Sequence, residues 1–343
     1  MKLKWNARCV GACLVALLLL MPGMECRAEK PELRFNAEGK FKIVQFTDLH
    51  VVWQDSRSDI AFERMNQVLD AEKPDMVVFT GDIIYSKPAD KNLRKVLGVV
   101  SDRKIPFAIT FGNHDNEQGL TNDELFKAAE TLPYHLTVDE VPELPGTGNC
   151  VLEVKSSDGK STAALLYCID SHSYSQVEGI KGYDYIKPEQ IAWYRQRSRE
   201  YTAANSGKPL PALAFFHIPL PEYAQAAGDQ SAAMFGVRKE PACNPVLNSG
   251  MFTAMKECGD VMGTFVGHDH DNDYVALWKG ILLAYGRFTG GNTEYNHLKN
   301  GARVIELTEN SRTFRTWIRT ADGTEQETIC SGENLDEEKN LHL

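Results

Sequence analysis

Residues 41–50 read FKIVQFTDLH, and this stretch decides how the chain is expected to fold. The run from Phe41 to Thr47 is rich in β-branched and aromatic residues, which is typical of a short buried strand. Two residues with metal-binding side chains, Asp48 and His50, follow directly. Buried strands that end in polar residues are predicted in five further stretches, at 76–80, 107–111, 164–169, 213–216 and 263–266.

Helical patterns separate several of these strands. An apolar stripe at spacings of three and four covers residues 61–72 and ends before Pro74. Thr121 and Glu124 form a capping box at the start of a second helix, and Pro188 begins a third. This alternation predicts an α/β domain with a central sheet, in which functional residues gather at the carboxyl ends of the strands.

The last part of the chain has a different pattern. The runs at 281–284, 302–307 and 313–318 follow one another closely without long helices between them, so we expect them to add antiparallel strands to a second sheet. No repeat or low-complexity linker divides the chain, which indicates one catalytic domain over residues 40–320. Residues 321–343 are expected to form an acidic C-terminal tail, loose after Cys330.

The N-terminus has the composition of a secretory signal peptide. Basic residues precede an apolar run from Val10 to Met21, and small or polar residues follow it, so we predict a signal peptide over residues 1–28. The run is too short to span a bilayer comfortably, and no later segment is apolar enough to do so. The protein is therefore expected to be secreted or periplasmic. Cys13 lies inside the apolar run, which makes a lipid-anchored form the less favoured alternative.

Charge and cysteine content exclude several classes of function. With 343 residues, 43% of them hydrophobic, the chain can form a large core and is neither disordered nor fibrous. A net charge of −10 disfavours binding to nucleic acid or to anionic membranes through a basic surface. The five cysteines beyond the predicted signal follow no zinc-binding spacing. The sequence leaves open whether Cys150 pairs with Cys168, Cys243 pairs with Cys258, or the cysteines are buried free thiols.

The strand ends carry the chemistry. Metal-binding residue types follow one strand after another, namely Asp48, His50, Asp82, Asn113, His217, His268 and His270. Hydrolysis of a phosphate ester at neutral pH requires charge neutralisation at phosphorus and a strong nucleophile, which two cations about 3.5–4 Å apart supply together. Asp82 is the natural bridging carboxylate, because each of its oxygens can bind one cation. The nitrogen and oxygen ligands favour zinc, manganese or iron over magnesium or calcium.

These residues resemble the five-motif signature of calcineurin-like metallophosphoesterases. The matching segments are Asp48-Leu49-His50, Gly81-Asp82, Gly112-Asn113-His114-Asp115, His217 and Gly267-His268-Asp269-His270. The first motif, together with residues 216–222 and 267–273, is similar to a small purple-acid-phosphatase-like branch of that superfamily. The likeness covers roughly residues 41–300.

The resemblance implies a fold and a role for each site residue. It implies a four-layer α/β/β/α sandwich with two transition metal ions. One ion would be held by Asp48, His50, Asp82 and His270, and the other by Asp82, Asn113, His217 and His268. In that family the histidine matching His114 contacts the phosphate and assists the leaving group, and the acid matching Asp115 orients it.

Tyr85 raises a separate question about the first ion. Typical purple acid phosphatases have a glycine at the position of His50 and a tyrosine three residues after the aspartate of the Gly-Asp motif. The phenolate of that tyrosine binds ferric iron and gives the colour. This chain has both His50 and Tyr85. We predict that His50 is the ligand, which allows a colourless enzyme with a non-ferric metal.

Other residues are open to two interpretations. Tyr174, Tyr183 and Tyr185 either wall a substrate pocket or pack as ordinary aromatics, and His172 either lines its mouth or lies on an exposed loop.

The candidate ligands and His114 together predict a phosphoesterase that acts on small phosphate monoesters by attack of a bridging hydroxide. A phosphodiesterase or pyrophosphohydrolase with the same metals, and a non-catalytic metal-stabilised binding protein, are the alternatives.

Overall fold

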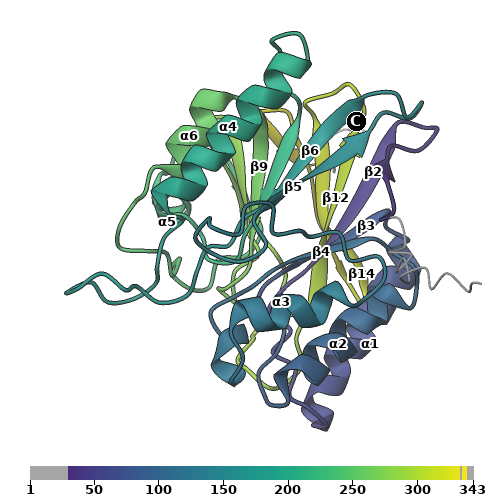
Figure 1. Cartoon of the computed structure of the whole chain (residues 1–343), viewed down its shortest axis with the longest axis vertical. Helices are drawn as coiled ribbons and strands as arrows, with labels where there is room; N and C mark the ends of the chain where they lie inside the picture. The colour runs from purple at the N-terminus through teal and green to yellow at the C-terminus, as the bar shows by residue number, and fades with distance from the viewer. Residues whose placement is uncertain (1–29, 333, 338–343) are drawn as a thin grey trace, which may run out of the picture.

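Two β-sheets lie face to face, with helices on the outer side of each, in the computed structural model of the chain (Figure 1). The structure describes residues 30–332 and 334–337. The predicted signal peptide and the last six residues of the predicted tail lie outside the described residues. The arrangement is the four-layer α/β/β/α sandwich that the resemblance implied.

The larger sheet has eight strands, and the smaller has seven. In spatial order the larger contains β1 (Leu33–Arg34), β5 (Cys150–Lys155), β6 (Thr162–Cys168), β7 (Ala212–Phe215), β9 (Val261–Val266), β11 (Ile281–Tyr285), β10 (Val275–Trp278) and β8 (Met234–Phe235). The smaller contains β15 (Leu335–Glu337), β14 (Gly323–Cys330), β13 (Phe314–Thr320), β12 (Gly301–Thr308), β2 (Lys40–Phe46), β3 (Met76–Thr80) and β4 (Phe107–Thr110).

The helices divide between the two outer faces. The helices beside the smaller sheet are α1 (Asp59–Glu72), α2 (Ala89–Ser101) and α3 (Asn122–Glu130), and those beside the larger are α4 (Pro188–Ala204), α5 (Pro221–Gly228) and α6 (Met251–Cys258) (Figure 1). Two short 3-10 helices, η1 (Ser56–Ser58) and η2 (Asp115–Gln118), complete the set within the described residues. The capping box predicted at Thr121 and Glu124 is present at the start of α3.

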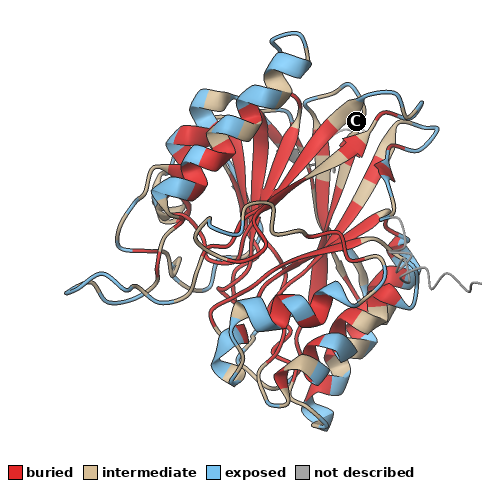
Figure 2. Ribbon diagram, in the orientation of Figure 1, coloured by how far each residue is buried: buried red, intermediate tan, exposed pale blue. Residues whose placement is uncertain are grey.

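Three hydrophobic cores hold the four layers together. In β2, the side chain of Ile43 packs between the two sheets, whereas its neighbour Val44 packs beneath the outer helices. This alternation follows from the period of two residues along a strand. Because both faces of the central strands are covered, they are buried along nearly their whole length (Figure 2). Phe215 of β7 belongs to the core between the sheets, and Phe216 to the core beneath α4, α5 and α6.

The six buried strands predicted between residues 41 and 266 are confirmed, and two expectations for the later part of the chain are corrected. The run at 281–284 is β11, which joins the larger sheet parallel to β9, whereas β12 and β13 form antiparallel pairs in the smaller sheet as expected. The domain also extends past residue 320, because β14 pairs with β13 and β15 pairs with β14. The sequence interpretation missed β14 because polar residues fill most of it and leave no apolar pattern.

Cys150 of β5 and Cys168 of β6 lie directly opposite each other, and both are buried free thiols. Among the described residues, no helix has both the length and the apolar character that a bilayer crossing requires.

Candidate dinuclear metal site

The seven predicted ligands come together at the carboxyl ends of strands from both sheets. Asp48 and His50 follow β2, Asp82 follows β3, Asn113 follows β4, His217 follows β7, and His268 and His270 follow β9. Parallel pairing of β2 with β3, of β3 with β4, and of β7 with β9 brings these ends to one edge. All seven side chains are buried, although each is polar. Buried polar groups of this density require partners.

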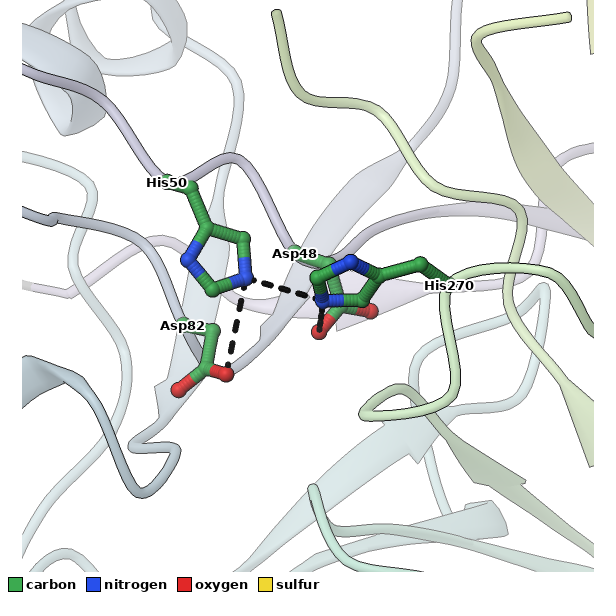
Figure 3. A group of neighbouring side chains, drawn as sticks. All are labelled: Asp48, His50, Asp82 and His270. Carbon is green, nitrogen blue, oxygen red and sulfur yellow. Dashed lines mark hydrogen bonds and ion pairs between the residues drawn. The ribbon is translucent and has the colours of Figure 1, made fainter. Parts of the chain in front are cut away.

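Asp48, His50, Asp82 and His270 form the first group that could hold a metal ion (Figure 3). The Nε2 atom of His50 lies 3.0 Å from Nε2 of His270 and 3.6 Å from Oδ2 of Asp82. Nε2 of His270 lies 3.9 Å from Oδ1 of Asp48. One candidate ligand atom from each residue lies within 4.8 Å of all the others, so the four side chains face a common point.

The second group consists of Asp82, His217 and His268. Nε2 of His217 lies 3.2 Å from Oδ2 of Asp82 and 3.3 Å from Nδ1 of His268. The amide oxygen of Asn113 is buried and has no hydrogen-bond partner, which makes it available as a further ligand. Asp82 belongs to both groups, as a bridging carboxylate must.

The hydrogen bonds around His217 show that a positive charge fits this site. Nδ1 of His217 donates to the backbone oxygen of Thr80 at 2.7 Å, so the neutral ring turns the lone pair of Nε2 toward the Asp82 carboxylate. Burial opposes a charge on the ring, but Asp82 outweighs burial and raises the pKa of His217 to about 10. A cation between the two side chains would satisfy both lone pairs. The residues present therefore fit a metal ion.

His270 has the same arrangement. Its Nδ1 donates to the backbone oxygen of Tyr295 at 2.9 Å, which leaves Nε2 as the lone pair directed at His50 and Asp48. Hydrogen bonds to backbone carbonyls commonly fix the ring tautomer of metal-binding histidines.

Backbone conformation at the site is unusual. Four of the predicted ligands have positive φ angles, with values of 53° for Asp48, 44° for His50, 50° for Asp82 and 80° for His268. Residues other than glycine rarely adopt this region, and each such residue costs of order 1–3 kcal/mol. The clustering of strained residues at strand ends is typical of functional sites, where side-chain direction is selected at the expense of stability.

Glycines of the motifs allow the loops to approach one another. A Cβ atom at Gly112 would overlap the Oδ1 atom of Asp82, and one at Gly267 would overlap the Thr47 hydroxyl and crowd the Asp48 carboxylate. The space that a side chain would need at these positions is occupied by the predicted ligands.

His114 lies beside the two groups but its carboxylate partner differs from the expected one. Its backbone N–H donates to Oδ1 of Asp82 at 2.9 Å, and its ring Nδ1 lies 2.7 Å from Oε2 of Glu117. Burial works against protonation of His114, but the carboxylates of Asp82 and Glu117 outweigh burial and raise its pKa.

Asp115 was expected to orient His114, and the structure corrects this. Its Oδ1 accepts hydrogen bonds from the backbone N–H groups of Ile83 and Ile84, and its Oδ2 accepts one from Gly112. Asp115 therefore braces the two motif loops against each other. Glu117, which the sequence interpretation missed, contacts His114 instead. Its position three residues after His114 on a short helical turn was the available signal.

Comparison with known proteins agrees with this geometry. The family model described as calcineurin-like phosphoesterase matches residues 41–272, which is more than half of the chain. The chain belongs to the calcineurin-like phosphoesterase family.

The chain is also similar to named relatives and, in fold, to solved structures. It is 34% identical to "Probable inactive purple acid phosphatase 29" of Arabidopsis thaliana, over 90% of this chain and 89% of the relative. It is 35% identical to the phosphatase DCR2 of Saccharomyces cerevisiae, over 82% of this chain and 54% of the relative. The fold is similar to that of a dimetal phosphatase from Danio rerio, with a TM-score of 0.57 at 13% identity over 85% of this chain and 98% of the other. It is also similar to purple acid phosphatase PPD1 of yellow lupin, with a TM-score of 0.52 at 11% identity over 88% and 55% of the two chains.

Tyr85 lies next to the site, and its hydroxyl forms a hydrogen bond with Glu294. Its ring packs against His50 and His114, with centroid separations of 5.2 and 5.3 Å. A hydrogen bond to Glu294, together with partial burial, raises the pKa of the Tyr85 hydroxyl to about 12. The hydroxyl is therefore protonated near neutral pH. This geometry favours His50 over Tyr85 as the ligand.

Two of the three tyrosines singled out in the sequence form a wall beside the second group. The ring of Tyr183 meets His268 edge-on with centroids 4.2 Å apart, and Tyr174 stacks on Tyr183 with centroids 5.8 Å apart. Tyr174 is 42% exposed. Tyr185 instead packs against the Lys187 ammonium. The chain thus has an aromatic surface next to its buried polar centre.

His172 is neither a ligand nor a freely exposed residue. Its Nε2 lies 2.7 Å from the side-chain oxygen of Gln190, and its backbone N–H donates to Asp170. These contacts fix the start of the loop that carries Tyr174 and Tyr183.

Proposed function

We propose that this phosphoesterase hydrolyses phosphate monoesters and that it uses two transition metal ions, from among manganese, zinc and iron. The observation that carries the proposal is the position of Asp82, which belongs to both groups of candidate ligands. One shared carboxylate between two sets of histidines is the arrangement that a pair of adjacent cations requires.

The residues that would hold the ions follow from the two groups. Asp48, His50, Asp82 and His270 would hold one ion, and Asp82, Asn113, His217 and His268 the other. Bound there, two cations would supply a nucleophile from water near neutral pH and neutralise charge on the phosphate. The strained backbone and the motif glycines support the assignment, because the strained residues are candidate ligands and the glycines leave room for ligand side chains.

His114 provides the acid for the proposed reaction. Its side chain is about one-third exposed at the edge of the buried groups, so it can reach a bound substrate. With Nδ1 against Glu117, its Nε2 is free to donate a proton to the leaving oxygen.

Some relatives carry the word inactive in their names, so activity needs a direct argument. Each of the seven predicted ligands is present in this chain and reaches the site, and His114 is present as well. Loss of one or more such residues is the usual route by which a metal-dependent hydrolase becomes inactive. This chain has no such loss, which supports catalysis over a purely structural role of the metal.

The test is an activity assay that includes metal identity. Purified protein would be freed of metal, loaded in turn with manganese, zinc or iron, and assayed on 4-nitrophenyl phosphate and on bis(4-nitrophenyl) phosphate. We expect two metal ions per chain and faster turnover of the monoester. Faster turnover of the diester would favour a phosphodiesterase. No turnover of either ester, with two ions bound, would rule out the proposed function.

A further inference from the structure

Glu117 lies between two side chains of the candidate site and contacts both. Its Oε2 is 2.7 Å from Nδ1 of His114, and its Oε1 accepts a hydrogen bond from the Tyr174 hydroxyl at 3.0 Å. The short helix η2 explains the first contact. In a 3-10 helix, side chains three residues apart lie above one another, so His114 at the start of η2 faces Glu117.

Tyr174 also connects this carboxylate to a predicted metal ligand. The side-chain NH₂ of Asn113 donates to the Tyr174 hydroxyl at 3.4 Å, and that hydroxyl donates to Glu117. An amide that donates through Nδ2 directs its Oδ1 the opposite way, and Oδ1 of Asn113 is the buried oxygen without a partner. The contacts therefore form a closed ring, Asn113, Tyr174, Glu117 and His114, since Asn113 and His114 are neighbours in sequence.

The other nearby carboxylate cannot serve His114. Both oxygens of Asp115 accept hydrogen bonds from backbone N–H groups of the motif loops, and the residue is fully buried. Glu117 is about one-third exposed and its oxygens face side chains. The carboxylate that contacts His114 is therefore Glu117, which lies two positions after the expected Asp115.

We propose that Glu117, held in place by Tyr174, is the positioning residue for His114 and extends the reaction to alkyl phosphates, whose leaving groups need a proton. This inference rests on the proposed function. In the step concerned, the oxygen of water forms a bond to phosphorus and the ester P–O bond breaks. The electron pair leaves on the alcohol oxygen, which takes the proton from Nε2 of His114. The products are inorganic phosphate and the alcohol.

Substrates with good leaving groups provide the internal control. The 4-nitrophenolate ion departs readily without a proton, so its release depends little on where His114 points, whereas an alkoxide requires the acid. A partly exposed His–Glu pair contributes little to folding stability, so Glu117→Gln should fold like the wild type. A loss that differs between the two ester classes therefore reports on positioning rather than on unfolding.

The experiment compares Glu117→Gln and Tyr174→Phe with the matched variants Glu130→Gln and Tyr185→Phe, all loaded with metal. Glu130 is an exposed residue at the end of α3, and Tyr185 lies in the same loop as Tyr174. Turnover would be measured on glycerol phosphate and on 4-nitrophenyl phosphate, with metal content determined for each protein.

We expect Glu117→Gln to lower kcat on glycerol phosphate by roughly 10- to 100-fold, the usual effect of removing the partner of an active-site histidine, and to lower kcat on the nitrophenyl ester far less. Tyr174→Phe should show the same split to a smaller extent, and both matched variants none. Glu117→Asp should not restore the alkyl activity, because its shorter side chain cannot span both contacts.

Four results would overturn the inference. Equal loss on both esters, or loss of metal from Glu117→Gln, would assign a purely structural role to Glu117. A wild type that cleaves the aryl ester but not glycerol phosphate would overturn the inference and leave the proposed function standing. A wild type inactive on both esters, with two ions bound, would end the proposed function and the inference with it.

Discussion

The Nε2 atoms of His50 and His270 lie 3.0 Å apart, although the two residues are 220 positions apart in the sequence. One follows a strand of the smaller sheet and the other a strand of the larger sheet. Two imidazoles that direct a nitrogen at the same point, beside the carboxylates of Asp48 and Asp82, form a set of ligand atoms that a cation between them would satisfy. The site therefore depends on the two sheets packing face to face.

Replacing the shared carboxylate is expected to remove metal. Asp82→Asn weakens both groups at once, so we expect metal content to fall well below two ions per chain and turnover to fall by several orders of magnitude. Elemental analysis and the aryl phosphate assay would measure this. Asp158→Asn, an exposed change in the β5–β6 hairpin, is the control. Full metal content in Asp82→Asn would contradict the bridging role.

His114→Ala is expected to separate chemistry from metal binding. Because His114 is not one of the grouped ligands, metal content should stay near the wild-type value while kcat falls by about 10²- to 10⁴-fold. The exposed His297 provides a matched control in His297→Ala. Unchanged kcat in purified His114→Ala would refute its role as the acid.

Gly112→Ala is expected to damage the site through sterics alone. The new Cβ would overlap the Asp82 carboxylate, so we expect a lower Tm together with reduced metal content. Gly98→Ala in α2 is the matched change, because nothing lies within 4 Å of its added Cβ. That variant should be unchanged or more stable by about 0.5–1 kcal/mol, since alanine is the better helix former. Similar Tm values for the two variants would contradict the steric argument.

The metal-loaded protein is expected to be free of the purple colour. His50 occupies the first group of candidate ligands, and the Tyr85 hydroxyl is hydrogen-bonded to Glu294, so we do not expect Tyr85 to provide a phenolate ligand. Visible spectra of the iron-loaded wild type and of Tyr85→Phe should therefore coincide. A visible band that disappears in Tyr85→Phe would assign the coordination position to Tyr85.

His135 is expected to make stability depend on pH. The ring is buried against Phe107 and Phe126, and burial lowers its pKa from 6.5 to about 3. The folded state therefore takes up the proton less readily than the unfolded chain. Its contribution to stability is fully present above pH 6.5 and is lost as the pH falls toward 3.

Between pH 6.5 and pH 5 the loss from this one group amounts to about 2 kcal/mol in the free energy of unfolding. The variant His135→Leu should flatten the dependence of Tm on pH over that interval, and His297→Gln, at an exposed position, should not. Parallel Tm profiles for His135→Leu and the wild type would show that His135 does not control acid stability.

Much of the site could be predicted because its signals are local. The end of a buried strand, the residue type that follows it and the glycine that permits a close turn all act within a few residues of one another. The stretch around Asp48 and the one around Asn113 each predicted a strand followed by ligand-type residues, and the structure places both at the same edge. The resemblance to calcineurin-like metallophosphoesterases then implied which of these distant residues share a metal ion.

The features that could not be predicted depend on contacts between residues that are far apart in the sequence. The amino-acid sequence by itself determined the six buried strands, the four-layer arrangement through its resemblance, and the seven candidate ligands. Only the tertiary structure decided that Glu117 rather than Asp115 contacts His114, that Glu294 holds Tyr85, and that β11 joins the larger sheet while β14 extends the smaller. Local periodicity reports burial and turn chemistry, whereas a side chain's direction and a strand's partner are set by packing between segments that the sequence keeps far apart.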